Sequence, residues 1–222
     1  MFANTRFGFA AVMLVAAITF ANDASATIIH ESATLGETGI HPGLSVFGEQ
    51  FVGSKFSLAS ATNVTSIAGH LQGSGSIFGA IVSLTGDDLL PAGNPFDLGV
   101  VLASGTFDVA FPSAERSLAL SLTLGPGDYG VIFGSGLFGA TGSASMPFSQ
   151  FTGAVDIGSP SYFLWDGDLG EWRDTEFSSL RFVVYGESVG VPEPATFGLL
   201  GLGLAAMAGL RRRKRMGVRP GR

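Results

Sequence analysis

The most concentrated group of chemically capable side chains in the sequence lies between residues 165 and 174. This stretch, WDGDLGEWRD, joins both tryptophans of the chain to four carboxylates. If exposed, the tryptophans would offer flat apolar faces to sugar rings, while the carboxylates would accept hydrogen bonds from sugar hydroxyls. The candidate glycan-binding residues are Trp165, Asp166, Asp168, Glu171 and Trp172.

The same segment admits two other interpretations. Its acidic spacing would suit calcium, which prefers several carboxylate and carbonyl oxygens, although the late bidentate glutamate of a full calcium loop is missing. Alternatively, the segment is a tight Asp-Gly turn whose tryptophans pack against the core. The sequence leaves all three interpretations open, and no cofactor other than calcium is suggested.

The other polar residues do not form a recognisable catalytic or metal-binding pattern. Asp87 and Asp88 follow a glycine at the end of an expected strand, where solvated turn residues are usual. The three histidines are widely separated and the chain has no cysteine, so zinc-site spacing and a thiol nucleophile are absent. A glycosidase needs two carboxylates at a fixed separation, which spacing along the chain does not reveal. We therefore expect a protein that is not an enzyme and has no metal site.

An antiparallel β-sandwich or jelly roll is the fold that the body of the chain predicts. Residues 117–124 read Ser-Leu-Ala-Leu-Ser-Leu-Thr-Leu, an alternation that puts four leucines on one face. Similar short runs recur with Gly, Pro, Asn and Asp between them, as in all-β sandwiches. The expected strands are 51–58, 64–71, 77–85, 98–103, 105–111, 117–124, 129–133, 162–165 and 180–185. We also expect an edge strand within 27–44 and an irregular strand around 148–155.

The charge of this body is strongly negative. Between residues 27 and 194, four basic residues stand against 17 acidic ones, which leaves a net charge of −13. Such a surface repels nucleic acid and cannot use the counterion release that drives phosphate binding. We therefore expect no nucleic-acid partner.

The N-terminus has the features of a signal peptide. Arg6 supplies a positive start, residues 7–20 are apolar apart from one threonine, and small residues follow at Ala24 and Ala26. This pattern predicts cleavage after Ala26, with Thr27 as the first mature residue. Residues 1–26 are therefore expected to be removed during export.

The C-terminus contains three successive features with separate physical roles. Residues 191–194, Val-Pro-Glu-Pro, form a stiff, helix-incompatible segment. Residues 195–210 carry no charge and would form an apolar helix about 24 Å long, short for a hydrocarbon core of about 30 Å. A basic cluster then resists translocation and favours the cytoplasmic side. The residues of this tail are Val191, Pro192, Glu193, Pro194, Arg211, Arg212, Arg213, Lys214 and Arg215.

This tail resembles the PEP-CTERM sorting signal of Gram-negative bacteria. The resemblance implies that an integral-membrane cysteine protease, exosortase, reads the tail and removes it while the apolar helix is transiently in the inner membrane. It also implies a place in the cell envelope, on the cell surface or outside the cell, where exopolysaccharide is made. The strand and turn patterns are similar to the sandwich domains common in such proteins and, distantly, to carbohydrate-binding jelly rolls.

The sequence therefore predicts five segments. They are a signal peptide (1–26), a β-sandwich (27–187), a linker with the Pro-Glu-Pro motif (188–194), an apolar sorting helix (195–210) and a basic cytoplasmic tail (211–222). The leading functional hypothesis is a non-enzymatic exported protein associated with exopolysaccharide or biofilm matrix. The alternative is a carbohydrate-binding module that uses the segment from Trp165 to Trp172.

Overall fold

The computed structural model of the protein describes residues 26–86, 88–158, 162–175 and 179–189. The predicted signal peptide up to residue 25, the Pro-Glu-Pro motif, the apolar helix and the basic tail lie outside these ranges. Within them, no helix is long and apolar enough to span a membrane.

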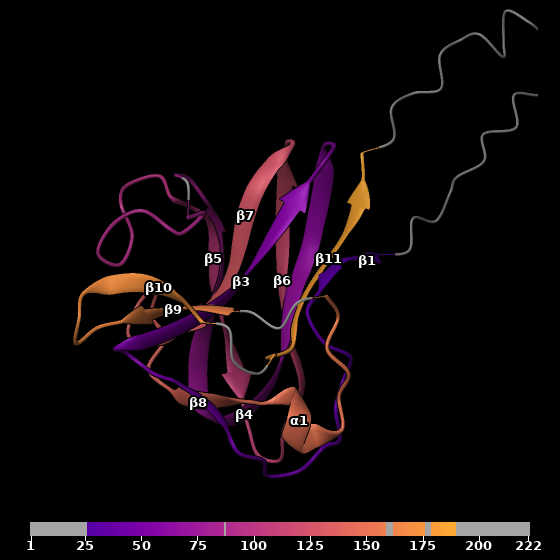
Figure 1. The fold of residues 1–222 in the computed structure, drawn as a ribbon, viewed down its shortest axis with the longest axis vertical. Coiled ribbons are helices and arrows are strands. Elements are labelled where there is room, and N and C mark those ends of the chain that lie inside the picture. The colour runs from indigo at the N-terminus through magenta and orange to yellow at the C-terminus, as the bar shows by residue number, and fades with distance from the viewer. Residues whose placement is uncertain (1–25, 87, 159–161, 176–178, 190–222) are drawn as a thin grey trace, which may run out of the picture.

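The described chain is almost entirely antiparallel β-structure (Figure 1). Its strands are β1 (Thr27–Glu31), β2 (Gly43–Val46), β3 (Gln50–Leu58), β4 (Thr62–Ser83), β5 (Val101–Val109), β6 (Ala114–Leu124), β7 (Gly127–Gly134), β8 (Ser143–Pro147), β9 (Tyr162–Asp166), β10 (Glu171–Thr175) and β11 (Phe182–Ser188). One short helix, α1 (Ser149–Thr152), follows β8 and ends at Gly153. The predicted all-β antiparallel sandwich is confirmed.

The long strand β4 belongs to both layers of the sandwich. Its first half pairs with β6 and β11, and β1 extends this first sheet beyond β11. Its second half pairs with β5 and β7, and the second sheet continues through β3 and β9 to β10. Between the halves, Gln72–Ser74 pair with β8, which also pairs with β2. The two sheets are therefore one curled hydrogen-bonded surface.

Gly75 marks the start of the second half of β4. Its φ of 74° lies in the left-handed region that glycine adopts without strain. A Cβ at this position would come within 2.9 Å of the Gly142 Cα atom. The chain thus changes course here without leaving the strand, because only glycine fits both the backbone angle and the close neighbour.

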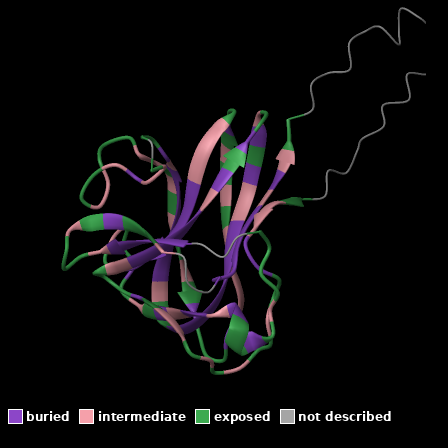
Figure 2. Ribbon diagram, in the orientation of Figure 1, coloured by how far each residue is buried: buried purple, intermediate pink, exposed green. Residues whose placement is uncertain are grey.

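An inner core fills the space between the two sheets. Phe133 of β7 and Phe182 of β11 stack across it with ring centroids 5.7 Å apart and planes 6° from parallel. Both side chains are completely buried. Figure 2 shows the buried positions running along the central strands. Apolar burial of this kind, at roughly 25 cal/mol per Å², is the main contribution that holds the two sheets together.

A second core covers the outer face of the second sheet. It collects Phe51, Phe78, Ile132, Phe163 and both tryptophans beneath the loop that joins β4 to β5. Leu89, Leu90, Phe96 and Val100 of that loop pack onto the cluster. The second sheet is therefore buried on both faces, which explains why β9 is apolar at four successive positions, Tyr162 to Trp165.

Several predicted strand boundaries were wrong. The expected strands 64–71 and 77–85 are one strand, because Gly73 to Gly75 bend the chain instead of turning it. The expected pair 98–103 and 105–111 is likewise the single strand β5, in which Gly105 makes room for Leu118. The irregular strand at 148–155 is instead α1 and a loop. The edge strand expected within 27–44 is present as β1.

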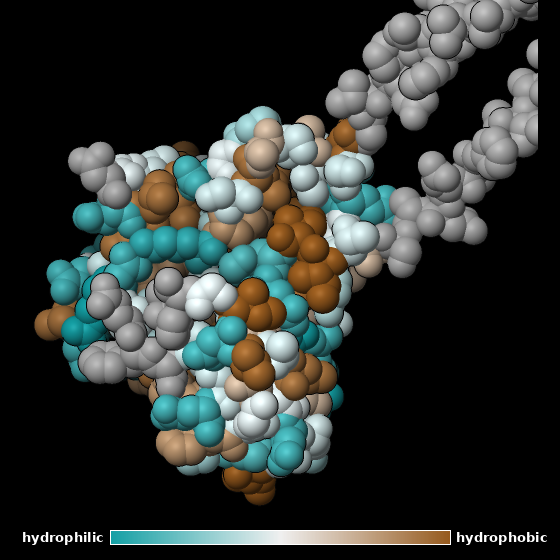
Figure 3. Space-filling view, turned by 45° about the vertical axis from the view of Figure 1, so that its right-hand side comes forward, coloured by the Kyte–Doolittle hydropathy of each residue, from teal (hydrophilic) through white to brown (hydrophobic). Residues whose placement is uncertain are grey.

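The surface mixes hydrophilic residues with separate apolar patches. On the face shown in Figure 3, hydrophobic side chains form a broken stripe below the point where the two ends of the described chain leave. Residues 32–37 run beside 152–157 through bonds such as Thr34 N–H to Val155 O at 2.9 Å. The exposed apolar side chains of these two segments are Leu35, Val155 and Ile157.

Candidate functional site

The tryptophan-rich segment forms the hairpin of β9 and β10. Trp165 and Trp172 are direct cross-strand partners, with ring centroids 5.5 Å apart. In the connecting loop, Gly170 has a φ of 69°, and its N–H donates to the Asp166 carbonyl at 2.7 Å. The sequence thus folds locally as a tight Asp-Gly turn, one of the three interpretations that it left open.

Both tryptophans are buried, so the exposed aromatic faces required by the glycan hypothesis are absent. Trp165 is 5% exposed and Trp172 is 9% exposed. The Trp172 ring lies 5.4 Å from Phe96 and 5.5 Å from Phe163, and its Nε1–H donates to the Pro95 carbonyl at 2.6 Å. The expectation of a sugar-stacking platform is corrected accordingly, since both rings are covered by the protein itself.

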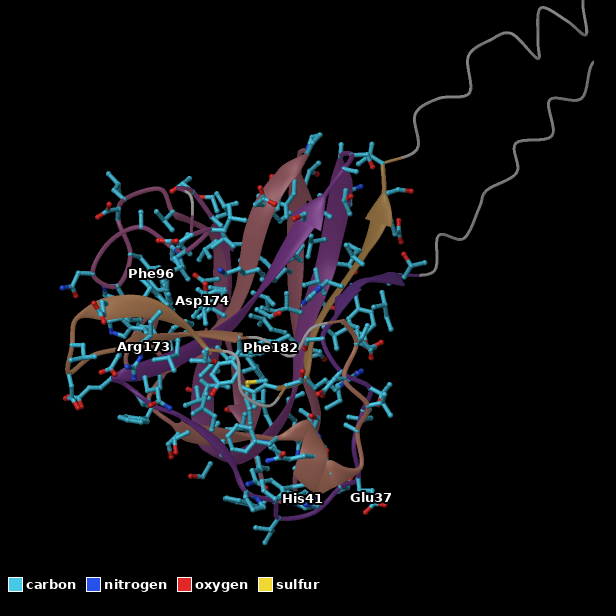
Figure 4. All side chains as sticks on the ribbon, in the orientation of Figure 1. Glu37, His41, Phe96, Arg173, Asp174 and Phe182 are labelled. Atoms are coloured by element: carbon cyan, nitrogen blue, oxygen red, sulfur yellow. The ribbon has the colours of Figure 1, made fainter. Side chains whose placement is uncertain are left out.

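The Asp166 carboxylate is used within the hairpin. Its Oδ1 accepts the N–H groups of Asp168 and Leu169, both at 3.2 Å, and its Oδ2 accepts Arg173 Nη2 at 2.7 Å. Figure 4 shows Arg173 and Asp174 on β10 with Phe96 on the neighbouring loop. This carboxylate is thereby committed to local structure, whereas Asp168 and Glu171 are exposed. Glycan binding through these polar groups and calcium binding both stay predictions.

Lys55 connects the hairpin to the β4–β5 loop. Its ammonium group lies 2.7 Å from Asp174 Oδ2 and donates to the Asp88 carbonyl at 2.7 Å. The side chains of Lys55 and Asp174 are partly exposed, so this ion pair contributes little to stability. The bond to the Asp88 carbonyl links the loop to β3. Among the described residues, no three His, Cys, Asp or Glu side chains gather as metal ligands would.

A buried ion cluster was missed by the sequence interpretation. Arg181 is 6% exposed and pairs with Glu31 of β1 and Glu115 of β6, the latter at 2.6 Å. It also donates to the Ala33 carbonyl, and the Tyr185 hydroxyl donates to Glu115 Oε1 at 3.0 Å. Burial lowers the pKa of Arg181, but its bonds to Glu115 and Glu31 outweigh this and raise the pKa overall. The sequence contained a signal for this cluster, because Arg181 interrupts an apolar run and a buried cation is normally paired.

Two histidines have lowered pKa values: His70, which is buried, and His30, which is partly buried. His30 Nε2 lies 3.0 Å from Ser54 Oγ, and its ring stacks on Phe56 with centroids 5.7 Å apart. Burial lowers the pKa of His30 to about 4, and the charge of Glu31 opposes this only in part. His70 is 2% exposed, and burial, followed by the charges of His41 and Arg181, lowers its pKa as well. Among the described residues, neither imidazole belongs to a group of three side chains that could bind a metal ion.

The described chain ends directly before the predicted sorting motif. β11 runs to Ser188, so the first residue of the predicted linker belongs to the sandwich. The Val189 N–H still donates to the Ala61 carbonyl at 3.0 Å. The predicted cleavage point at the other end, between Ala26 and Thr27, directly precedes β1. The residues Val191 to Pro194 and Arg211 to Arg215 fall beyond the part of the chain that the structure describes.

The comparisons with known proteins bear on this C-terminal segment. Residues 190–214 match the PEP-CTERM protein-sorting motif. A folded all-β domain that leads directly into this motif defines an exported protein with a C-terminal sorting signal. The chain therefore contains a PEP-CTERM sorting motif. It is exported across the inner membrane, processed by the membrane enzyme exosortase and then bound to the surface or secreted.

The remaining comparisons add no functional argument. No curated protein matches the chain. A structure of the T13 particle of infectious bursal disease virus is 11% identical, covers 84% of this chain and 48% of its own, and has a TM-score of 0.25. The VP2 subviral particle of the same virus is 11% identical over 85% of this chain and 50% of its own, with a TM-score of 0.21. The chain thus spans about half the length of these proteins.

Proposed function

We propose that the sandwich is a non-enzymatic component of the extracellular matrix, delivered by exosortase-dependent sorting to a site where exopolysaccharide accumulates. The observation that carries this proposal is the use of the tryptophan-rich hairpin for folding. Its two indoles lie in the outer core, and the Asp166 carboxylate is bonded to its own hairpin. The group of residues best suited to binding or catalysis is therefore part of the scaffold.

The charge distribution supports a role in a hydrated matrix. Lys55, Arg173 and Arg181 each pair with carboxylates of the domain, so the remaining acidic side chains dominate the surface. An anionic surface stays soluble and resists adsorption to nucleic acid and to other anionic polymers. An acidic polysaccharide would be repelled by this surface, so binding it would need hydrogen bonds or a bridging cation. A neutral polysaccharide would meet no such repulsion.

A partition experiment in the producing strain tests this function. The sandwich would carry an internal epitope tag, and its distribution between cells, matrix and culture fluid would be compared with and without exopolysaccharide synthesis. We expect the protein in the matrix fraction when polysaccharide is made, and in the fluid when it is not. Deletion of the gene should lower the mass or cohesion of the matrix. An unchanged partition together with an unchanged matrix would refute the proposal.

A further inference from the structure

The two ends of the described domain lie side by side at one corner. Thr27, the first residue of β1, pairs with Gly186 of β11, and its hydroxyl donates to the Gly186 carbonyl at 2.9 Å. Figure 1 shows that the chain leaves the domain on the same side at both ends. Because the sorting motif begins at residue 190, the membrane enzyme that reads it must approach this corner.

The strand that leads to the motif remains paired almost to the motif itself. Glu187 and Ser188 pair with Asn63 and Thr62 of β4, and the Val189 N–H bonds to β4's preceding turn at Ala61. Pro192 is three residues beyond Val189. Even fully extended, three residues span only about 10 Å, so Pro192 cannot lie farther than this from Val189.

The end of β11 is held much more weakly than its beginning. Phe182, Val183 and Val184 are completely buried, whereas Ser188 and Val189 are exposed. The register of the β11–β4 pairing shifts between Tyr185 and Gly186, and this irregularity separates the last residue pairs from the buried part of the strand. β1 begins opposite Gly186 of β11. The described residues after Gly186 therefore form backbone bonds only to β4 and to the turn before it. Segments with few buried apolar contacts open locally far more often than the core does.

Proteases commonly bind a substrate segment in extended form, through its backbone groups and alternate side chains. With β11 fully paired, only Gly190 and Val191 separate the folded strand from Pro192. The backbone of residues 187–189 is already bonded to β4, and the body of the sandwich stands beside it. Release of this short segment would give a membrane-embedded enzyme more room to reach Pro192 beside the domain.

We propose that the β1–β11 corner is the surface that exosortase approaches, and that the enzyme reads Pro192-Glu193-Pro194 only after residues 187–189 have detached from β4. The inference rests on sorting by exosortase and is independent of any role in the matrix. Detachment increases the number of residues between Pro192 and the last residue bonded to β4 or its preceding turn from two to five, while the buried half of β11 keeps the domain folded.

A cross-link between β4 and β11 tests the proposal. The chain has no cysteine, so the double variant Asn63→Cys and Glu187→Cys places one disulfide across two partners that lie at the weak end of β11. The full chain, oxidised before use, would be incubated with purified exosortase in lipid nanodiscs, and the cleaved product measured by intact mass. We expect cleavage at least tenfold slower than for the matched variant Asn63→Ser and Glu187→Ser.

A second disulfide controls for the effects of cross-linking itself. Ser57→Cys and Asp128→Cys would join β3 to β7 at two register partners whose side chains bond to each other, and β11 is not hydrogen-bonded to either strand. This variant should be cleaved as fast as the unmodified chain in the same buffer. Inserting six Gly and Ser residues after Val189 should restore full cleavage to the cross-linked β4–β11 variant, because the motif then reaches the enzyme without strand opening.

Equal cleavage of the two oxidised variants would overturn the proposal. Failure of the insertion to restore cleavage would also overturn it, since the disulfide would then act by some route other than access. If the unmodified chain itself were not cleaved, the assignment to exosortase would fail and the inference with it.

Discussion

Trp172 lies at the centre of the outer core, and its indole N–H satisfies the Pro95 carbonyl at 2.6 Å. Residue type and spacing correctly indicated that the tryptophans and acids between 165 and 174 act together. They did not indicate whether the indoles face solvent, because that depends on the β4–β5 loop that folds over β9 and β10 from a distant part of the sequence. The exposure of an aromatic side chain is a tertiary property, and local spacing does not determine it.

Replacement of Trp172 by alanine should destabilise the fold. Removing a large buried aromatic ring typically costs about 3–5 kcal/mol of unfolding free energy, through lost burial and the cavity that remains. Urea denaturation followed by circular dichroism would measure the change. Leu169→Ala, at the exposed tip of the same hairpin, should change the unfolding free energy by less than about 0.5 kcal/mol. Equal midpoints for both variants would contradict the buried position of Trp172.

The lowered pKa of His30 predicts a loss of stability in mild acid. Its pKa is about 4 in the folded protein, against 6.5 for the ordinary side chain. The His30 side chain therefore binds a proton more readily in the unfolded chain than in the folded one. Its contribution to the unfolding free energy is complete above pH 6.5 and is lost as the pH falls from 6.5 toward 4. The full loss amounts to about 3 kcal/mol.

The matched variant for this prediction is His30→Gln, which keeps a polar side chain near Ser54 but does not titrate in this range. Urea denaturation at about pH 7.5, 6.5, 5.5 and 4.5 would give the dependence of the unfolding free energy on pH for each protein. The unmodified protein should show a steeper decline between pH 6.5 and 4.5 than the variant. Parallel curves would show that His30 keeps its ordinary pKa in the folded state.

At the scale of the elements, β4 shows why strand boundaries were harder to predict than the fold. The alternating leucines of β6 and the apolar runs of β3 and β7 indicated strands, and each is present. Gly73-Ser74-Gly75 looked like a turn, since glycine is the usual marker of one. Here β8 pairs with Gln72 to Ser74 and supplies the backbone partners that keep the bend within a strand. A pairing with residues about 70 positions away is invisible to local patterns.

Gly75→Ala tests the bend in β4. The substitution places a Cβ on a backbone with φ of 74° and only 2.9 Å from Gly142 Cα. Gly86→Ala is the control, because Gly86 has a φ of 80° but open space where the Cβ would lie. Both variants should lose about 1–2 kcal/mol through backbone strain, and Gly75→Ala should lose measurably more through the clash. Equal thermal shifts would mean that the segment at Gly142 moves away from β4 without a measurable cost in stability.

The Arg181 cluster joins three strands of the first sheet and its neighbouring segment. Arg181→Ala would leave the carboxylates of Glu31 and Glu115 without their cation, in a largely buried site. Breaking a buried pair in this way typically costs about 3–5 kcal/mol. Arg173→Ala, which removes a surface pair with Asp166, should cost at most about 1 kcal/mol. Chemical denaturation of both variants would reveal the difference, and similar losses would contradict the burial of Arg181.

For the whole molecule, the strongest expectation concerns its two ends. Processing at both should yield a protein that begins at Thr27 and lacks the basic residues from Arg211 onward. Intact-mass measurement of protein recovered from the producing cells and their medium would test both cleavages. A mature mass that retains the basic tail would contradict sorting by exosortase, and a mass that includes residues before Thr27 would contradict the predicted signal cleavage.

The sequence was most informative about transport and least informative about the role of the domain. Transport is encoded in short linear signals, whose charges and apolar lengths act without a folded context. The role of the sandwich depends on which side chains the fold leaves at its surface. The ion cluster and the surroundings of His30 arise through contacts between distant strands, whereas Asp166 is bonded within its own hairpin.

Both tryptophans of the chain share one cluster, on the outer face of a single sheet. Intrinsic fluorescence therefore senses the packing of that face and is blind to the phenylalanine stack between the layers. If the β4–β5 loop lifts away first on heating, emission will shift to the red while circular dichroism still reports an intact sandwich. If the two signals change together, the protein melts as a single cooperative unit.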